Sequence, residues 1–450
     1  MPRQLHLNLF VQSRGHHEAA WNHPDAAPDA LTDVRYYQKI AQRAEQGLFD
    51  SIFFADQLAL SDDAARSGRV WLEPVTLIAA LSMVTTRIGM VATASSSYTE
   101  PFNLARQFAS IDHISGGRAA WNIVTSWLKP VAHNFGRGEA ADLADRYAMA
   151  EDYVQVVKDL WDSWADDAVI DDRARGIWAR PERITAIDHA GPHYSCTGPL
   201  NLPRSPQGRP VLVQAGASDA GRAFAARHAE VVFTAHLVKP RAQEFYADLK
   251  QRIASARRDP AHVLVLPGLN PTIASTEAEA KRLQQELNEA TDPEIGRRTL
   301  SSRFGGADFS QLPLDRALTP DDFPDAATVD ASRSRAEMVH DIIRREPGMT
   351  LRQLLARLAG ARGHITFAGT PEQVADLIED WFINGAADGF NVMPPLFPGM
   401  LDAFIEGVVP ILQQRGLFRT EYTGTTLREH YGLERPASRF WEENQSDEQT

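Results

Sequence analysis

Residues 211–221 read VLVQAGASDAG, an apolar run followed by small residues and a serine. This pattern predicts a β-strand that passes directly into a helix running from Ser218 to His228. Backbone N–H groups at a helix N-terminus, together with the positive end of the helix dipole, favour an anion such as phosphate. The same residues fit a simpler interpretation, in which Ser218 only caps the helix and the small residues only permit a tight turn.

Short β-type runs alternate with helical patterns through most of the chain, which is typical of parallel strands joined by crossover helices. Eight strands are predicted, at residues 5–10, 51–55, 88–93, 119–125, 211–215, 231–234, 263–270 and 389–393. Further helices are predicted at residues 36–46, 74–85, 103–114, 147–164 and 371–384. This alternation predicts an α/β fold, a (β/α)8 TIM barrel whose active site lies at the carboxyl ends of the strands. A doubly wound open sheet is the weaker alternative, because no GxGxxG motif follows the first strand.

A single domain spanning residues 1–450 is expected, with two insertions in the barrel. Residues 166–210 are rich in Pro, Gly and charge, with a small hairpin expected near residues 193–196. Residues 291–362 begin as loop-like sequence and continue as helices at 334–345 and 351–358, so we interpret them as an insertion that serves as a lid. The chain after Gly416 is expected to pack loosely, and residues 440–450 to be disordered.

Charge and cysteine content narrow the class of protein. The chain has 450 residues and a formal net charge of -13, with its arginines scattered, which argues against nucleic acid or an anionic membrane as a partner. A lone cysteine, Cys196, gives no disulfide framework and no cysteine metal cluster, and fits a reducing compartment. No signal-peptide core and no run of about 18 apolar residues is present. We therefore expect a cytoplasmic protein with no membrane or nucleic-acid partner.

Polar side chains follow several of the predicted strands. Asp56 follows the second strand, Thr93 starts a hydroxyl-rich TASSSY run after the third, and Asn122 lies within the fourth. At the mouth of a barrel these groups are placed to bind a polar ligand. A structural role stays open for each of the first two, because Asp56 also fits as a helix cap and serines are common in loops.

Histidine and tryptophan gather after the first strand, in RGHH at residues 14–17 and WNHP at residues 21–24. Adjacent histidines in a loop do not easily turn toward one metal, so we expect no metal site and expect His16 to line a substrate pocket. The chain has no Gly-x-Ser-x-Gly elbow and no Cys/His arrangement, so nucleophilic catalysis is not supported.

Taken together, these segments resemble the bacterial-luciferase-like flavin-dependent monooxygenases, in the branch that contains the nitrilotriacetate, dibenzothiophene-sulfone and long-chain alkane monooxygenases. The resemblance runs from about Leu5 to about Leu417 and rests on the order and number of its motifs. The motifs are LNLF with GHH and WNHP, FDSIFFAD, EPVTLIAALS, DHISGGRAAWNIVTS, NFG, DRYAMAEDYVQVVKDLWDSW, VLVQAGASDAGRAFAARHAE, GTPEQVAD and ADGFNV. The resemblance implies the same barrel with insertions.

The resemblance also implies a cofactor, partners and site residues. The cofactor is FMN, supplied as FMNH2 by a separate NAD(P)H:flavin reductase and used with O2 on a small-molecule substrate. Its flavin end is expected near Asp56, Thr93 and Ser126, and its phosphate near Tyr147, Ala217 and Ser218. Our own candidates for catalytic residues are His16, which would assist the reaction of reduced flavin with O2, Trp127, which would shape the substrate side, and Asn122 on the wall opposite His16.

The chain departs from the family pattern at two histidines. Leu143 and Trp127 stand where family members carry histidine, so those family roles do not transfer. An organosulfur or heteroaromatic substrate, cleaved at a C–S or C–N bond, fits a pocket of tryptophan and histidine better than an alkane does. The alternatives are a deazaflavin-dependent oxidoreductase on the same barrel and a non-catalytic flavin-binding protein. A homodimer or homotetramer is expected.

Overall fold

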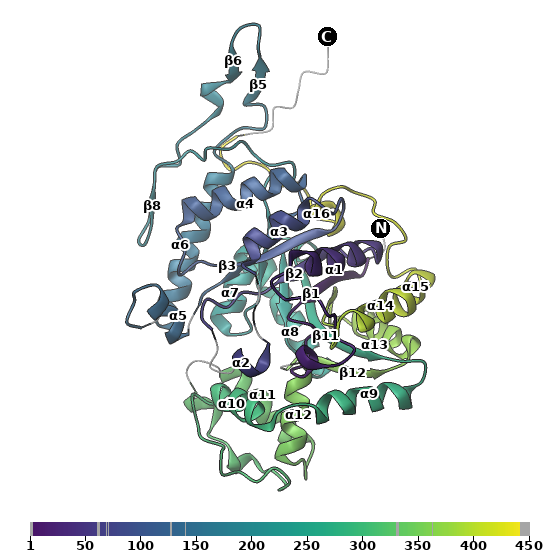
Figure 1. Ribbon diagram of the computed structural model, residues 1–450. Helices are drawn as coiled ribbons and strands as arrows, with labels where there is room; N and C mark the ends of the chain where they lie inside the picture. The colour runs from purple at the N-terminus through teal and green to yellow at the C-terminus, as the bar shows by residue number, and fades with distance from the viewer. Residues whose placement is uncertain are drawn as a thin grey trace.

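The computed structural model describes residues 3–60, 64–68, 70, 72–126, 128–139, 141–329, 333–361 and 363–441. Eight parallel strands close into a barrel in the order β1, β2, β3, β4, β9, β10, β11, β13 and back to β1 (Figure 1). Their bounds are His6–Val11, Ser51–Phe54, Gly89–Ser95, Ala119–Val124, Val211–Gln214, Val231–Thr234, Leu264–Ile273 and Gly389–Val392. Each strand lies where the sequence predicts one, so the predicted TIM barrel is confirmed.

Helices surround the barrel and bury their apolar faces against it. The helices around the barrel are α1 (Val34–Gln46), α2 (Ala64–Ser67), α3 (Pro74–Ser82), α4 (Pro101–Ser115), α5 (Lys129–Asn134), α6 (Leu143–Trp161), α7 (Asp219–His228), α8 (Lys239–Ser255), α13 (Pro371–Ile383), α14 (Gly399–Ala403) and α15 (Val409–Gln414). Proline opens α3, α4 and α13, where its missing N–H costs no helical hydrogen bond. In the described part of the chain, no helix is both long and apolar enough to cross a membrane.

The long strand β11 connects the barrel to the second insertion. Its first half pairs with β10 and β13 inside the barrel, and its second half pairs with β12 (Ile365–Gly369), a strand that the sequence analysis did not predict. Between them lie α9 (Glu277–Glu289), α10 (Pro293–Arg303), α11 (Arg333–Arg345) and α12 (Leu351–Ala361), at the bottom of Figure 1. Side chains such as Phe304, Phe323 and Leu354 form a hydrophobic core within the insertion. The insertion therefore packs as a unit of its own beside the barrel mouth.

The first insertion forms an arm that extends away from the barrel (Figure 1). It contains two hairpins, β5 (Val169–Asp172) with β6 (Ile177–Ala179), and β7 (His189–Ala190) with β8 (Ser195–Cys196). Asp152 of α6 holds the second hairpin, because its carboxylate lies 2.7 Å from His189 Nε2 and accepts the backbone N–H groups of His193 and Tyr194 at 2.8 Å. The hairpin expected near residues 193–196 is thus present.

The expectation of loose packing after Gly416 is wrong for residues 417–441. This segment, with its short helix α16 (Leu427–His430), closes the N-terminal end of the barrel, and Leu427 and Tyr431 are 0% and 2% exposed. The Tyr431 hydroxyl donates to Asn8 Oδ1 at 2.9 Å and lies 3.0 Å from Ser51 Oγ. The apolar side chains of this segment are widely spaced in the sequence, and we interpreted that spacing as loose packing, although they are buried against the ends of the strands. Of the end expected to be disordered, 440–450, only residues 440 and 441 are among those described.

A buried carboxyl group beneath β4 makes stability depend on pH. Asp112 Oδ1 accepts hydrogen bonds from Ala119 N–H at 2.9 Å and Gln207 Nε2 at 2.7 Å. Burial outweighs these bonds and raises the pKa of the Asp112 carboxyl from 3.8 to about 6. Because the folded pKa lies above the unfolded one, this group contributes its full stability below pH 4, and the contribution is lost as pH rises to about 6.

We expect Asp112→Asn to remove this loss, since the amide keeps an acceptor oxygen and carries no charge. Two pKa units correspond to about 3 kcal/mol, so the free energy of unfolding of the parent should fall by an amount of this order relative to the variant between pH 4 and pH 7. Urea unfolding of both proteins at the two pH values measures the difference. Parallel pH dependence in both proteins would contradict the assignment.

Candidate active site

Aromatic rings from three strands form the floor of the barrel mouth. The Phe10 ring lies 4.6 Å from Phe53 and 5.5 Å from Phe233, measured between centroids. The His364 ring stacks on Phe233 at 4.9 Å with an interplanar angle of 2°. Alternation along the strands turns these rings inward, where they belong to the cluster of apolar side chains inside the barrel. The floor is therefore apolar and excludes water.

Two predicted residues meet above this floor. Thr93 of β3 and Asn122 of β4 are directly paired in register, and Asn122 Nδ2 donates to Thr93 Oγ1 at 2.8 Å. Thr93 Oγ1 in turn donates to the Phe54 carbonyl at 2.9 Å. Among the described residues Asn122 Oδ1 is buried without a hydrogen-bond partner, an arrangement that is costly unless a ligand supplies a donor.

The rim of the mouth is polar. Ser126 Oγ lies 2.8 Å from Ser95 Oγ, which joins the ends of β3 and β4. Asp56 follows β2 and is partly exposed, and its carboxylate accepts the Gln57 N–H at 2.8 Å. The third predicted catalytic residue, Trp127, lies outside the described residues.

The predicted anion site at α7 is assembled from two parts of the chain. Ser218 caps the helix, and its Oγ accepts the Gly221 N–H at 3.1 Å. Tyr147 of α6 packs on Phe224, and its hydroxyl comes so close to the turn that a Cβ on Gly216 or Gly221 would lie 3.0 or 2.9 Å from it.

The two glycines therefore let the Tyr147 hydroxyl and the Gln214 side chain pack closely against the turn, and these groups form a cradle at the helix N-terminus beside the exposed Ala217. Next to it, the partly buried Arg146 donates to the Thr125 carbonyl at 3.0 Å, and burial lowers the pKa of its guanidinium. A hydroxyl, N–H groups at a positive helix end and a nearby cation are the donors that a phosphate requires. The residues present thus fit an FMN phosphate.

The adjacent histidines turn to different partners. His16 is 1% exposed, its Nε2 lies 2.9 Å from the Phe10 carbonyl, and its ring contacts Phe10 at 4.5 Å. His17 Nε2 lies 3.1 Å from Asn288 Oδ1, toward the second insertion, and burial lowers the pKa of the His17 ring. His16 thus belongs to the floor of the mouth, whereas His17 ties the loop after β1 to α9, the helix that leads into the insertion.

The sequence analysis did not predict the aromatic floor of the barrel mouth. Phe10, Phe53 and Phe233 lie at inward positions of strands that were predicted, so the alternation along each strand was the available signal. His364 was missed because it precedes β12, which itself went unpredicted; the GHITFAG sequence of residues 363–369 carried that signal.

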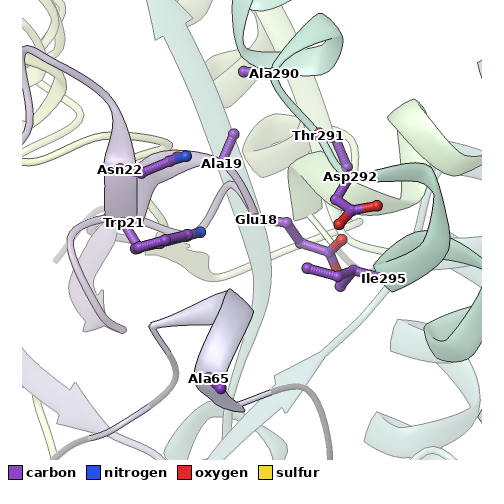
Figure 2. A pocket seen from close by; sticks show the side chains of 9 residues that line it. All are labelled: Glu18, Ala19, Trp21, Asn22, Ala65, Ala290, Thr291, Asp292 and Ile295. Carbon is purple, nitrogen blue, oxygen red and sulfur yellow. The ribbon is translucent and has the colours of Figure 1, made fainter.

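A separate cavity of about 260 Å³ lies beside the loop after β1, at residues 18–22 (Figure 2). Three segments line it: the loop after β1, the short helix α2 and the start of the second insertion. The lining residues are Glu18, Ala19, Trp21, Asn22, Ala65, Ala290, Thr291, Asp292 and Ile295. None of the predicted site residues is among these nine, so the cavity is distinct from the groups that surround the floor and the phosphate cradle.

Comparison with known proteins agrees with this geometry. The model of the luciferase-like monooxygenase family matches residues 10–388. The chain belongs to this family. It is 45% identical to N-acetyl-S-(2-succino)cysteine monooxygenase of Bacillus subtilis (strain 168), covering 97% of this chain and 98% of the relative. It is also 45% identical to nitrilotriacetate monooxygenase component A of Aminobacter aminovorans, covering 96% and 97%.

Solved structures give the same result. Riboflavin lyase (RcaE), determined with modified FMN and riboflavin, matches with a TM-score of 0.84 and 31% identity over 96% of both chains. An F420-dependent secondary alcohol dehydrogenase matches with a TM-score of 0.54 and 13% identity, a likeness that shows the fold alone. The resemblance drawn from the sequence is confirmed: the chain is an enzyme, a luciferase-like flavin-dependent monooxygenase.

Proposed function

We propose that this protein is the oxygenase component of a two-component system that uses FMNH2 and O2 to cleave a C–S or C–N bond in a small organic substrate. The observation that carries the proposal is the cradle at Tyr147, Gly216 and Ser218, which lies on the same rim as the apolar floor. A relative named as a component A supports the supply of FMNH2 by a separate NAD(P)H:flavin reductase.

Two sets of side chains at opposite ends of the mouth bind the two ends of FMN. Ser218, Tyr147 and the first turn of α7 hold the phosphate, while Asp56, Thr93 and Ser126 face the flavin end. Asn122 Oδ1, which lacks a donor among the described residues, accepts a hydrogen bond from the bound flavin or substrate. When bound, FMNH2 supplies the two electrons that reduce O2. The protein excludes water with its aromatic floor and holds a proton donor, His16, beside it.

Organosulfur and amine compounds are the substrate classes that we propose first, with heteroaromatic compounds after them. One relative is named for an S-substituted cysteine and another for nitrilotriacetate, so C–S and C–N bonds are both represented among close relatives. Oxygen transfer to the substrate, with reduction of the second oxygen atom to water, balances the two electrons of FMNH2.

The experiment that tests this function is oxygen uptake by the protein with a generic flavin reductase, NADH and FMN. A panel of S-substituted cysteines, aminopolycarboxylates, sulfones and heteroaromatic compounds is offered, and products are identified by mass spectrometry. Substrate-dependent incorporation of labelled oxygen from O2 supports the proposal. Hydride transfer from a reduced deazaflavin without O2 consumption would favour the oxidoreductase alternative, and tight flavin binding without either reaction would favour a flavin-binding protein.

We further propose that residues 291–362 act as a lid. The insertion has its own hydrophobic core and follows β11 at the mouth, so it is built to move as a unit. Limited proteolysis is expected to cut first between Ser301 and Asp322. Addition of FMN together with a compound that the enzyme accepts as a substrate is expected to slow that cut several-fold. A cleavage rate that ligands leave unchanged would show that the segment is a fixed insertion.

A further inference from the structure

Helix α7 packs against α6 from its first turn to its last residue (Figure 1). At the first turn, the Tyr147 hydroxyl of α6 lies close to Gly221. The Tyr147 ring lies 5.7 Å from the Phe224 ring, and the Phe224 ring lies 4.9 Å from the ring of His228, which ends α7. Ring contacts thus connect the phosphate cradle to the opposite end of the helix.

His228 bridges two charged residues of α6. Its Nε2 lies 2.6 Å from Glu151 Oε2, and its Nδ1 lies 3.1 Å from Lys158 Nζ. Tyr147, Glu151 and Lys158 follow one another at helical spacing, so they share one face of α6. Because Lys158 can only donate, it bonds to Nδ1 only while His228 is neutral, with the ring proton on Nε2 toward Glu151.

The surroundings of this pair resist a second proton. Burial lowers the pKa of the Lys158 amine from 10.5 to about 7, and burial also lowers the pKa of the His228 ring from its ordinary 6.5. The carboxylate of Glu230 already accepts from Arg428 at 2.7 Å. The charged groups that face Lys158 are Arg209 before β9, Glu230 before β10, Arg258 after α8 and Arg439 near the end of the described chain, and those that face His228 are Glu151 and Arg227.

We propose that His228 is a positioning residue for the FMN phosphate: the neutral ring holds α7 in line with Tyr147, and the protonated ring pushes α7 away from Lys158. This inference rests on the proposed function, because it requires the phosphate to lie in the cradle. Two cations 3.1 Å apart repel each other strongly in a buried site. The tilt reaches the first turn of α7, where the Tyr147 hydroxyl packs so closely against Gly221 that a small movement changes the donors facing the phosphate.

The direction of the pH effect follows from this contact. FMN binds the form in which His228 is neutral, so FMN affinity falls as the pH is lowered through the pKa of His228, which lies below 6.5. Reciprocally, bound FMN lowers that pKa further. The phosphate of FMN also takes up a proton near pH 6, which by itself weakens binding of the dianion about fourfold at pH 5.5. A variant that removes only the Lys158 amine separates the two effects.

The test compares the affinities for FMN and for riboflavin, by quenching of flavin fluorescence, in the parent, Lys158→Met and Lys250→Met. Lys250 is a matched control, since burial lowers its pKa too but its amine donates to the Pro260 and Val263 carbonyls, away from α6. Between about pH 7.5 and pH 5.5 we expect the parent and Lys250→Met to lose about twentyfold in FMN affinity and Lys158→Met about fourfold. Riboflavin affinity should change little in all three proteins.

His228→Leu tests the positioning role directly. We expect this variant to bind FMN about fivefold more weakly than the parent at about pH 7.5 and to bind riboflavin equally well. A residue that served only the stability of the fold would change both affinities alike. Calorimetry in buffers of different ionisation enthalpy gives a second measurement, in which FMN binding at about pH 6 should release more protons from the parent than from Lys158→Met.

Two results would overturn the proposal: a Lys158→Met variant that follows the parent in both pH measurements, or a His228→Leu variant that binds FMN like the parent. Ser218→Ala separates this failure from a failure of the cradle itself. If Ser218→Ala loses FMN affinity relative to riboflavin while Lys158→Met follows the parent, the cradle stands and the role of His228 falls. If Ser218→Ala leaves the ratio of the two affinities unchanged, both fall.

Discussion

Replacing His16 with alanine is expected to divert the oxygen consumed into hydrogen peroxide, with product formation falling about 100-fold or more while FMN still binds. The His16 ring is buried against Phe10, with its Nε2 2.9 Å from the Phe10 carbonyl. In the role that we propose for His16, alanine removes the proton donor, and it also leaves a gap beside the aromatic floor that water can enter. When water enters the site, reduced flavin reduces O2 to hydrogen peroxide and no oxygen atom is transferred to the substrate.

The measurement is the ratio of product to peroxide at saturating FMNH2, with FMN affinity determined separately by fluorescence. His17→Ala is the control, since His17 is also buried but turns to Asn288. It should leave the ratio within about twofold of the parent while weakening the contact between the loop after β1 and α9. If His16→Ala lost FMN binding at an unchanged ratio, His16 would be a structural residue. An unchanged ratio and rate would remove it from the active site, and Asn122 would become the first residue to test.

Ser218→Ala is expected to weaken FMN binding by about tenfold or more and to leave riboflavin binding nearly unchanged. In the structure Ser218 Oγ accepts the Gly221 N–H, so its own proton remains available to a phosphate oxygen. A charge-assisted hydrogen bond of this kind contributes about 1.5–3 kcal/mol, which is the basis of the expected factor. Riboflavin has no phosphate, so it offers no acceptor for the Ser218 hydroxyl and its affinity should not depend on this donor.

Loss of a helix cap also costs about 1 kcal/mol of stability, and this effect must be separated from ligand binding. Thr370 provides the control, because its hydroxyl caps α13 in the same way, accepting the Gln373 N–H. Thr370→Ala should lower stability about as much as Ser218→Ala and leave the FMN affinity unchanged. Titrations of both variants with FMN and with riboflavin decide the matter. If both ligands lost affinity equally in Ser218→Ala, the phosphate assignment would be refuted.

Local patterns were enough to predict the barrel, because short, mostly apolar runs alternate regularly along the chain with segments of helical periodicity. The strand β12 was not predicted, because ITFAG at residues 365–369 mixes small and polar side chains and pairs only with the outer half of β11. The tail was misjudged for a related reason. Leu427 and Tyr431 are too widely spaced to form a local apolar run, and their burial comes from strands more than 300 residues earlier in the chain.

The candidate site likewise contains some residues that local sequence patterns predict and others that only the tertiary structure brings together. Positions at strand ends and at a helix N-terminus follow from local sequence, so Thr93, Asn122 and Ser218 were predictable. The pairing of Tyr147 with Gly216 depends on how α6 packs against α7, and the stacking of His364 on Phe233 depends on where the chain returns after the second insertion. Such contacts are set by the tertiary structure, and no periodicity within one segment reports them.

Residues 417–441, which cover the N-terminal end of the barrel, affect how the barrel assembles and where ligands enter it. Residues 417–441 follow every barrel strand in the chain, yet Leu427 and Tyr431 close the interior of a barrel whose first strand begins at His6. All eight strands can therefore pair before this segment covers their N-terminal ends, and a truncation at Gly416 would leave that end of the barrel open. Because this segment covers the N-terminal ends of the strands, we expect ligands to enter the barrel from the carboxyl ends, where the candidate site lies.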